Sequence, residues 1–537
     1  MNNKTFGLII VVFAGLGVWW WSRSSPWDKA QRAIDRGEPG DAVEILVDAL
    51  ESKSWSPQKE EAMRELLAKG YWNKGVMDSA EQAFRDLREK FPNNFQAAMG
   101  LGALNIIRDR GSFGVEYLED AKRLDPKDVR PYLLLGNYFA DIRDYPQAQL
   151  NLANGLVRFP NDDRLAMLAG DLLFNQGRYQ EALAKYQPLI SSTPADRNLR
   201  IKMAKAFLFS GDLEKASEIF SSLRPSSGTD EIIESYLAKI LFLQGRRRES
   251  SAIFERLYRE DNRRVGSGLE WALSLARENQ LDEAEKLMAT IGEKLLPLGG
   301  GVTMPVAGVS FNDLERIQSF RTAAKNQNIL YLQTKAVISE ISGKYAEAEQ
   351  SLNRALNIDS GDFFTMAELS ELARLKNEIE ERLRWANRAV EMYKEHPAAL
   401  LMRAKIFLDI RRTPDAILDA KQVSDSYPRL AYAQALLSKA WMIQKNPSAA
   451  LLAAEKAVQL NPGEPEALLS LAIAKASLGR DQEADSAFRQ ALDINPRFAE
   501  ARVEWGRWLK SKGRLKEATI QFNEAALLEP IVFKHVR

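Results

Sequence analysis

The chain has 537 residues, too many for one ordinary hydrophobic core, which indicates several domains or a repeat array. Its 74 Lys and Arg residues nearly balance its 73 Asp and Glu residues, so no global basic field points to nucleic acid. Cysteine is absent and the only histidines are His396 and His535, which excludes disulfides and thiolate metal sites and disfavours a histidine-based triad or metal cluster.

The first predicted element is an apolar helix within residues 1–26. Residues 6–21 contain no charged or strongly polar side chain, and at 1.5 Å per residue they span about 24 Å, slightly less than a hydrocarbon core of about 30 Å. Tryptophan favours the boundary between hydrocarbon and headgroups, and a long basic side chain can reach that boundary. The residues expected at this membrane interface are Trp19, Trp20, Trp21 and Arg23. We expect an uncleaved signal anchor; a cleaved signal peptide and a buried core helix are the alternatives, and no small-x-small site follows the run.

The charges around this helix give two indications about the side on which the rest of the chain lies. Lys4 precedes the helix, whereas Arg23, Lys29, Arg32 and Arg36 follow it, which favours a cytoplasmic body. The short start "MNNK" before an apolar run is typical of an export signal. We expect a single-pass protein of the inner (cytoplasmic) membrane with a periplasmic body, and a cytoplasmic body is the alternative.

Beyond residue 40 the chain has the composition and apolar spacing of helices, and one pattern recurs with a period of 34. A proline ends each amphipathic segment, because it has no N–H and cannot continue a helix. These prolines are Pro92, Pro126, Pro160 and Pro194, and later Pro428, Pro462, Pro496 and Pro530. Twelve positions earlier stand Ala80, Gly114, Ala148, Ala182, Ala416, Ala450, Ala484 and Ala518. Eight positions earlier stand Phe84, Leu118, Leu152, Tyr186, Phe488 and Phe522.

This pattern resembles the tetratricopeptide repeat, because several positions agree over many copies. Small residues such as Gly102, Gly136, Gly170 and Gly506 also mark the preceding helix, where close packing against a large side chain is expected. The resemblance covers roughly residues 27–530 and implies an all-α fold: a right-handed α-solenoid of antiparallel helix pairs with a concave groove. We count 13 repeats in phase and one earlier degenerate copy.

The repeat phase slips once, and this slip suggests the domain boundaries. The equivalent of Met288 in the next repeat is Leu352, which lies one repeat plus 30 further along the chain. The predicted parts are the anchor over 1–26, an N-terminal array over 27–298, an insertion of a loop and a helix over 299–328, a C-terminal array over 329–530 and a tail over 531–537. The insertion is a hinge, an added docking element or a tolerated decoration.

No motif in the sequence indicates catalysis. The glycine-rich "LPLGGGVTMPVAGV" lacks the phosphate-loop lysine, and paired acids such as Glu60 and Glu61 fit solvated helix faces. The turn "GRRRES" at residues 245–250 could hold a phosphate or an anionic lipid head, and a solvated loop is the favoured interpretation. We therefore expect no enzyme activity, no cofactor and no metal site.

In proteins that resemble this one, the first helix of each repeat lines the concave surface at its second, fifth, ninth, twelfth and thirteenth positions. By phase, the candidate partner groove contains Met99, Ile107, Leu133, Met167, Phe174, Ile201, Lys205, Phe209, Lys239 and Phe242. A clamp for a terminal carboxylate is rejected, since Leu133 stands where the lysine should be, although Asn137 matches. Either these residues are core between helices, or they form a hydrophobic groove for an amphipathic or extended partner segment.

The resemblance implies a membrane-anchored scaffold or adaptor that binds other proteins and helps assemble an envelope complex of the secretion, pilus, polysaccharide or cytochrome-biogenesis type. A chaperone-like protein that captures peptide segments of exported clients is the alternative. The expected partners are proteins in or near the same membrane, and lipid through the N-terminal helix, but not nucleic acid. No residue pattern selects the pathway or the oligomeric state.

Overall fold

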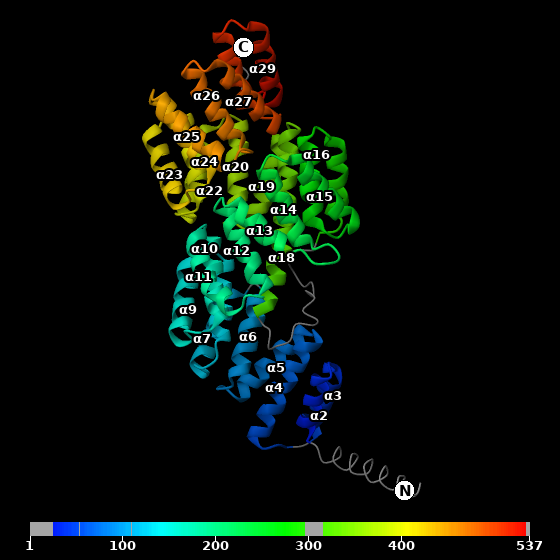
Figure 1. Ribbon diagram of the computed structural model, residues 1–537. Helices are drawn as coiled ribbons and strands as arrows, with labels where there is room; N and C mark the ends of the chain where they lie inside the picture. The colour runs from blue at the N-terminus through cyan, green and yellow to red at the C-terminus, as the bar shows by residue number, and fades with distance from the viewer. Residues whose placement is uncertain (1–24, 53, 109, 296–314, 533–537) are drawn as a thin grey trace, which may run out of the picture. The chain divides into compact units, whose positions relative to one another are not determined.

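The computed structural model describes residues 25–52, 54–108, 110–295 and 315–532. The predicted anchor with Trp19, Trp20, Trp21 and Arg23 lies outside these residues, as do most of the insertion and of the tail. Every element of secondary structure in the described residues is an α-helix (Figure 1). None of the helices in these ranges combines the length and the apolar character that a membrane crossing requires.

The described helices form fourteen successive pairs, as many as the 13 in-phase repeats and one degenerate copy counted in the sequence. The first half contains α2 (Pro26–Asp35), α3 (Pro39–Ser52), α4 (Pro57–Lys74), α5 (Met77–Lys90), α6 (Phe95–Ile107), α7 (Gly111–Leu124), α8 (Arg130–Asp141), α9 (Tyr145–Arg158), α10 (Asp163–Asn175), α11 (Tyr179–Ser192), α12 (Arg197–Phe209), α13 (Leu213–Ser222), α14 (Glu231–Leu243) and α15 (Arg247–Glu260). The second half contains α16 (Val265–Arg277), α17 (Leu281–Gly292), α18 (Glu315–Ile341), α19 (Tyr345–Ile358), α20 (Phe363–Leu375), α21 (Ile379–Met392), α22 (Pro397–Asp409), α23 (Thr413–Ser426), α24 (Ala431–Ile443), α25 (Pro447–Leu460), α26 (Pro465–Ser477), α27 (Asp481–Ile494), α28 (Ala499–Ser511) and α29 (Leu515–Leu528).

The recurring prolines end the second helix of a repeat, as the sequence predicts. Helix α5 ends at Lys90, two residues before Pro92, and α27 ends at Ile494, two residues before Pro496. The next helix then begins with a side-chain cap: Asn94 Oδ1 accepts the Ala97 N–H at 2.8 Å and satisfies one free donor of the first turn. The repeat period therefore fixes where each helix starts and stops.

Small and large residues pack against each other between the two helices of a repeat. Gly506 of α28 faces Phe522 of α29 so closely that a Cβ atom there would lie 2.6 Å from the ring. Gly102 of α6 faces Leu118 of α7 in the same way, at 2.7 Å. The pairing expected from the sequence is confirmed at both positions, and a larger residue there would push the two helices apart.

Helix α18 has 27 residues and is about twice as long as its neighbours. Within α18, the helix predicted for the insertion continues without a break into the first helix of the next repeat. Asn312 and Asp313, either of which the sequence suggests as the N-cap of this helix, lie outside the described part. The repeat that follows the phase slip is therefore a normal helix pair with an extended first helix.

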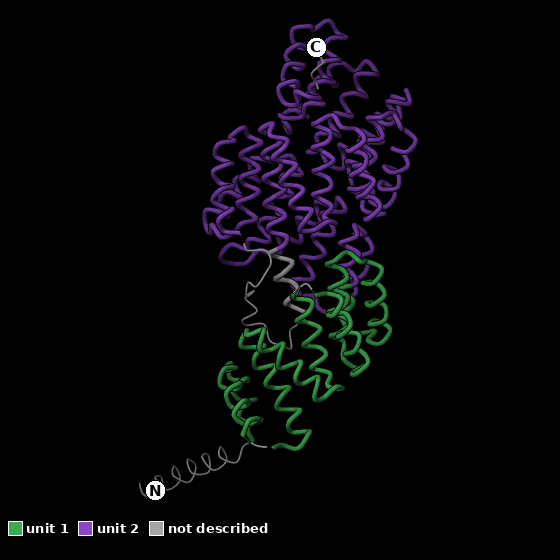
Figure 2. Tube along the Cα trace, turned by 180° about the vertical axis from the view of Figure 1, so that it is seen from behind, with its two compact units in different colours: residues 1–168, 299–323 green, residues 169–298, 324–537 purple. Residues whose placement is uncertain are grey.

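Contacts divide the chain into two compact units (Figure 2). Unit 1 comprises residues 1–168 and 299–323, and unit 2 comprises residues 169–298 and 324–537. The division after Leu168 falls inside α10, so the units differ from the two arrays expected on either side of the insertion. Unit 1 has its own core around Trp72, Phe84 and Leu104.

Unit 2 joins segments from both predicted arrays through contacts between loops that are distant in sequence. Tyr427 Oη donates a hydrogen bond to the Gly177 carbonyl at 2.6 Å, and Asn461 Nδ2 donates one to the Leu243 carbonyl at 2.9 Å. Arg429 pairs with Glu214 at 3.0 Å. Because these partners are 215–250 residues apart, one stretch of repeats comes back against an earlier one. We call this set of loop contacts the turn contact.

Candidate partner-binding surface on the first helices

Four of the predicted groove residues lie in unit 1, and two of them are core residues. Met99 is 0% exposed and Leu133 is 3% exposed, so both are buried between helices. Ile107 and Met167 are half-buried. Of the two interpretations that the sequence left open, Met99 and Leu133 therefore fit the core between helices and not the groove.

In unit 2, several predicted groove residues come together on successive first helices. The rings of Phe174 and Phe209 lie edge to face with centroids 5.6 Å apart. Lys205 Nζ lies 5.3 Å from the centroid of Phe174 and 5.8 Å from that of Tyr236, and Lys239 Nζ lies 5.8 Å from the same Tyr236 ring. Phe209 is 37% exposed, so the surface is open to contact. The name aromatic strip is used below for Phe174, Lys205, Phe209, Tyr236, Lys239 and Phe242.

Not every predicted position belongs to this surface. Ile201 is 8% exposed and packs in the core around Phe220. Tyr236 was missed because it stands at the sixth position of its repeat, which is not among the positions that line the groove in similar proteins. Its ring connects Lys205 to Lys239 by cation–π contacts, each of which contributes about 0.5–1 kcal/mol at exposed sites.

The cations of the strip differ in their partners. Lys239 pairs with Glu270 at 3.2 Å; burial opposes its charge, but Glu270 outweighs burial and raises the pKa of Lys239. Lys205 forms no ion pair with any residue that the structure describes, and its ammonium lies over the rings of Phe174 and Tyr236. The strip therefore offers apolar faces together with positive charge that the fold does not neutralise.

The first helices from α22 to α28 carry a second, charged part of the surface. Lys405 lies 3.5 Å from Glu466 and 3.9 Å from Glu500, and Lys439 pairs with Glu500 at 2.7 Å. These ion pairs connect first helices that are two or three repeats apart, so the side chains of several first helices meet on one surface. Glu371, Lys405 and Lys439 stand one repeat period apart at the ninth repeat position. The charged surface could therefore have been predicted from the sequence.

Acids near α18 and α20 are crowded on this surface. Burial, together with the neighbouring Glu371 carboxylate, raises the pKa of Glu368 to about 7. Burial and the charges of Glu368 and Glu371 also raise the pKa of Glu340 well above its ordinary value. Burial opposes the charge of Glu371 as well, but Arg374, 2.7 Å away, lowers its pKa to about 2. At neutral pH this region therefore holds protons on some of its acids.

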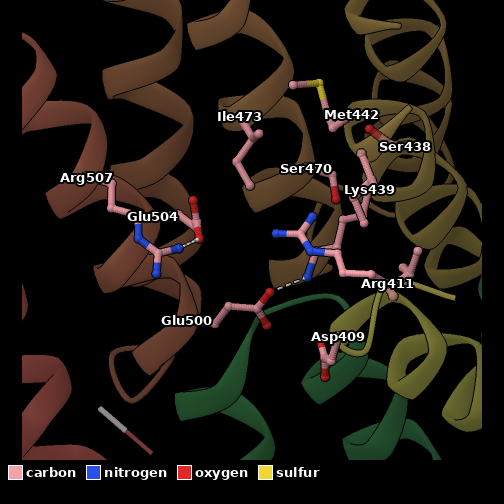
Figure 3. A pocket seen from close by; sticks show the side chains of 12 residues that line it. Asp409, Arg411, Ser438, Lys439, Met442, Ser470, Ile473, Glu500, Glu504 and Arg507 are labelled. Carbon is pink, nitrogen blue, oxygen red and sulfur yellow. Dashed lines mark hydrogen bonds and ion pairs between the residues drawn. The ribbon is translucent and has the colours of Figure 1, made fainter. Parts of the chain in front are cut away.

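A pocket of about 430 Å³ opens on α22, α24, α26 and α28 (Figure 3). Its wall combines the apolar side chains of Met442 and Ile473 with the Lys439–Glu500 ion pair. Arg411 extends into it from the loop after α22, with φ at 63°, a backbone conformation that costs a non-glycine residue energy. No described group of His, Asp and Glu side chains, here or elsewhere, could hold a metal ion.

The comparisons with known proteins agree with this architecture. A model described as tetratricopeptide repeat matches residues 133–197, 401–465 and 444–497, and a second model with the same description matches residues 173–240. A TPR repeat-containing protein of Methanocaldococcus jannaschii is 23% identical over 175 residues, which is 30% of this chain and 30% of that relative. The chain thus matches less than a third of the length of this curated relative.

A solved structure shares the fold over most of its length. One chain of the crystal structure of the APC/C hetero-tetramer Cut9–Hcn1 superposes with a TM-score of 0.61 at 11% identity, covering 96% of this chain and 97% of that one. At this identity the similarity establishes the fold alone. The protein is therefore an all-α solenoid of the tetratricopeptide superhelix kind. The tetratricopeptide models match residues 133–240 and 401–497, which confirms the repeat assignment from the sequence period over these residues.

Proposed function

We propose that this protein is a membrane-anchored tetratricopeptide scaffold that binds a segment of another protein on the aromatic strip and helps assemble an envelope complex. The observation that carries the proposal is the strip itself. Aromatic rings and an unpaired lysine lie partly exposed on consecutive first helices, where an extended segment could contact several repeats at once. A solved protein of the same fold is described as part of a hetero-tetramer, which is in keeping with a role in assembly.

The anchor belongs to the same proposal and is supported by the sequence alone. The apolar run of residues 6–21 and the three tryptophans with Arg23 are typical of an interface-anchored helix. In this proposal the helix holds the repeats at the inner membrane with the body on the periplasmic side. Partners are then proteins in or near that membrane, and the protein has no catalytic activity of its own.

Site-specific photocrosslinking in the native membrane tests the binding function. A photoreactive phenylalanine analogue at position 209 should capture one stable partner. With the analogue at position 174 instead, F209D should abolish capture of that partner while the helical circular dichroism stays unchanged. A matched control places the analogue at Leu418 of α23, which is 68% exposed and lies outside the strip. Equal capture at both positions would contradict the proposal, and transient capture of many unfolded clients would replace it with the chaperone-like function.

Localisation needs separate measurements. Protease added to spheroplasts should degrade the repeats if the body is periplasmic, and should leave them intact if it is cytoplasmic. Changing Trp19, Trp20 and Trp21 to alanine should weaken membrane retention after carbonate extraction. Retention at the wild-type level would refute the interface role of the tryptophans.

A further inference from the structure

Two guanidinium groups lie against one ring of the aromatic strip. The Arg247 guanidinium carbon is 4.8 Å from the centroid of the Phe242 ring, and that of Arg277 is 5.1 Å from the same centroid. Arg247 begins α15 and Arg277 ends α16, so adjacent repeats contribute the two charges. The interpretation of "GRRRES" as a solvated loop therefore does not hold for Arg247, whose side chain is held against Phe242.

Neither arginine has a carboxylate partner. Within the residues that the structure describes, neither forms an ion pair, and Arg247 Nη1 donates one long hydrogen bond to Asn495 Oδ1, at 3.4 Å. Arg247 Nε is buried without an acceptor. Glu270, on the same helix as Arg277, is engaged by Lys239. Among the described residues the two like charges therefore have no carboxylate at ion-pairing distance, although Glu270 and Glu368 act on Arg277 from farther away, and one buried donor has no acceptor.

A second pair of arginines in unit 2 also lies against one ring, but both of these arginines have carboxylate partners. Arg403 and Arg412 lie 5.6 and 4.5 Å from the centroid of the Phe407 ring. Arg403 pairs with Asp419 at 2.8 Å, and Arg412 pairs with Asp415 at 2.9 Å. Within the described residues, the pair at Phe407 therefore has carboxylates at ion-pairing distance, whereas the pair at Phe242 has none.

The electrostatics of the site favour the binding of an anion. Burial lowers the pKa of Arg247 and of Arg277, and the charge of Arg277 lowers the pKa of Arg247 further. Glu464 and Glu466 act on Arg247 from beyond ion-pairing distance. Burial, the charge of Glu466 and a hydrogen bond with it raise the pKa of Glu464 well above its ordinary value, so Glu464 is protonated more readily than an ordinary glutamate. A bound anion would remove the repulsion between the arginines and give Arg247 Nε an acceptor.

We propose that Arg247 and Arg277 bind an aspartate or glutamate carboxylate of the partner segment, with Phe242 positioning both guanidinium groups. The planar guanidinium matches a carboxylate with two parallel hydrogen bonds, and Lys205 adds a further unpaired positive charge on the same strip. Neighbouring first helices are about 8–10 Å apart, which an extended chain spans in about three residues. The segment therefore carries an apolar residue for Phe209 and an acidic residue about three positions away. This inference rests on the proposed function, because the carboxylate belongs to the partner.

A short polyglutamate peptide is the probe for the site, measured by isothermal titration against the detergent-solubilised full chain. R247Q and R277Q should each weaken binding about tenfold, the loss of one hydrogen-bonded charge. The matched control is R412Q, which removes a ring-bound guanidinium that already has its aspartate, and its affinity should equal that of the wild type. R277Q should not lower the melting temperature of the free protein, because it relieves repulsion, whereas a merely structural arginine would lower it.

Three outcomes would overturn the inference. The first is polyglutamate binding that R277Q leaves unchanged. The second is an equal loss in R412Q, which would indicate a general charge effect. The third is binding of inorganic phosphate at this site without binding of polyglutamate at the same ionic strength.

Crosslinking at position 209 separates this inference from the proposed function. Undiminished partner capture in R277Q would refute the carboxylate site and leave the scaffold function standing. Absence of any capture with wild-type arginines would refute the scaffold function, while the titration still decides whether the arginines bind a carboxylate.

Discussion

The two units are built from the same repeat but differ in how far their contacts reach along the chain. In unit 1 the described bonds connect adjacent repeats: Arg88 pairs with Asp120, and Asn94 Nδ2 donates to Glu61 at 2.9 Å. In unit 2 the turn contact joins loops that are distant in sequence, such as Gly177 and Tyr427, which are 250 residues apart. A solenoid of nearest-neighbour contacts loses stability locally, whereas a contact between its turns couples distant repeats. The binding surface proposed above lies on the coupled unit.

The largest expected effect comes from equivalent core truncations in the two units. Phe84 in unit 1 and Phe220 in unit 2 are both 0% exposed, and Phe→Ala at either should cost about 3–5 kcal/mol. Hydrogen exchange should show F84A loosening mainly α4 to α7, and F220A also loosening the helices around Arg429, because the turn contact transmits the damage. Loss confined to α12–α15 in F220A would show that the turn contact does not couple repeats.

A pH effect follows from the one described histidine, which lies in unit 2. His396 is buried against Tyr179 and Phe363, and burial lowers its pKa to about 4. Above pH 6.5 the His396 side chain is neutral in both the folded and the unfolded state. Between about pH 6.5 and 4 only the unfolded state takes up the proton, so stability falls as pH falls, by up to about 3 kcal/mol. Urea unfolding at pH 7 and pH 4.5 measures this loss.

The control for the pH effect is H396F, which keeps a ring on Phe363 and cannot titrate. It should remove the loss of stability that His396 causes on acidification and leave the opposite contribution of Glu368, whose raised pKa favours the folded state as pH falls. Unit 1 should show no comparable histidine effect, since residues 1–168 contain no histidine. An equal pH dependence in H396F would assign the effect to other groups.

A smaller loss of stability is expected when a side-chain atom is added at the turn contact, where it overlaps a neighbouring loop. A Cβ atom at Gly463 would collide with the backbone of Gln244, so G463A should cost about 2 kcal/mol. Gly266 has open space around its Cβ position, and G266A is the matched control, expected to be neutral or slightly stabilising at the start of α16. Chemical denaturation of both variants decides the point; equal stability would mean that the loops can move apart without cost.

The smallest effect tests one hydrogen bond of the same contact. Y427F removes the donor to the Gly177 carbonyl and should cost about 1 kcal/mol. The matched variant Y393F removes the hydroxyl that donates to the Gly361 carbonyl at 2.5 Å, a bond between adjacent repeats. Both should lose similar stability, but only Y427F should raise hydrogen exchange at Gly177. Raised exchange at Gly177 in Y393F but not in Y427F would contradict the role given to the turn contact.

The candidate surface was only partly predictable. Phe174, Lys205, Phe209 and Lys239 were found by repeat phase and do come together in unit 2. Met99, Leu133 and Ile201 occupy corresponding positions but are buried, because the fifth position packs against the neighbouring helix in these repeats. Phase alone does not separate a groove position from a core position that adjoins it.

The local architecture could be predicted from the sequence: prolines and caps set the helix ends, and small–large pairs such as Gly506 with Phe522 set the packing within a repeat. Both depend on residues less than one repeat period apart, so one repeat contains the information. Three features could not be predicted in this way: the contact of Gly177 with Tyr427, the burial of His396, and the position of Arg247 and Arg277 against one ring. Those contacts depend on small rotations between repeats that accumulate over many copies, and no single repeat records their sum.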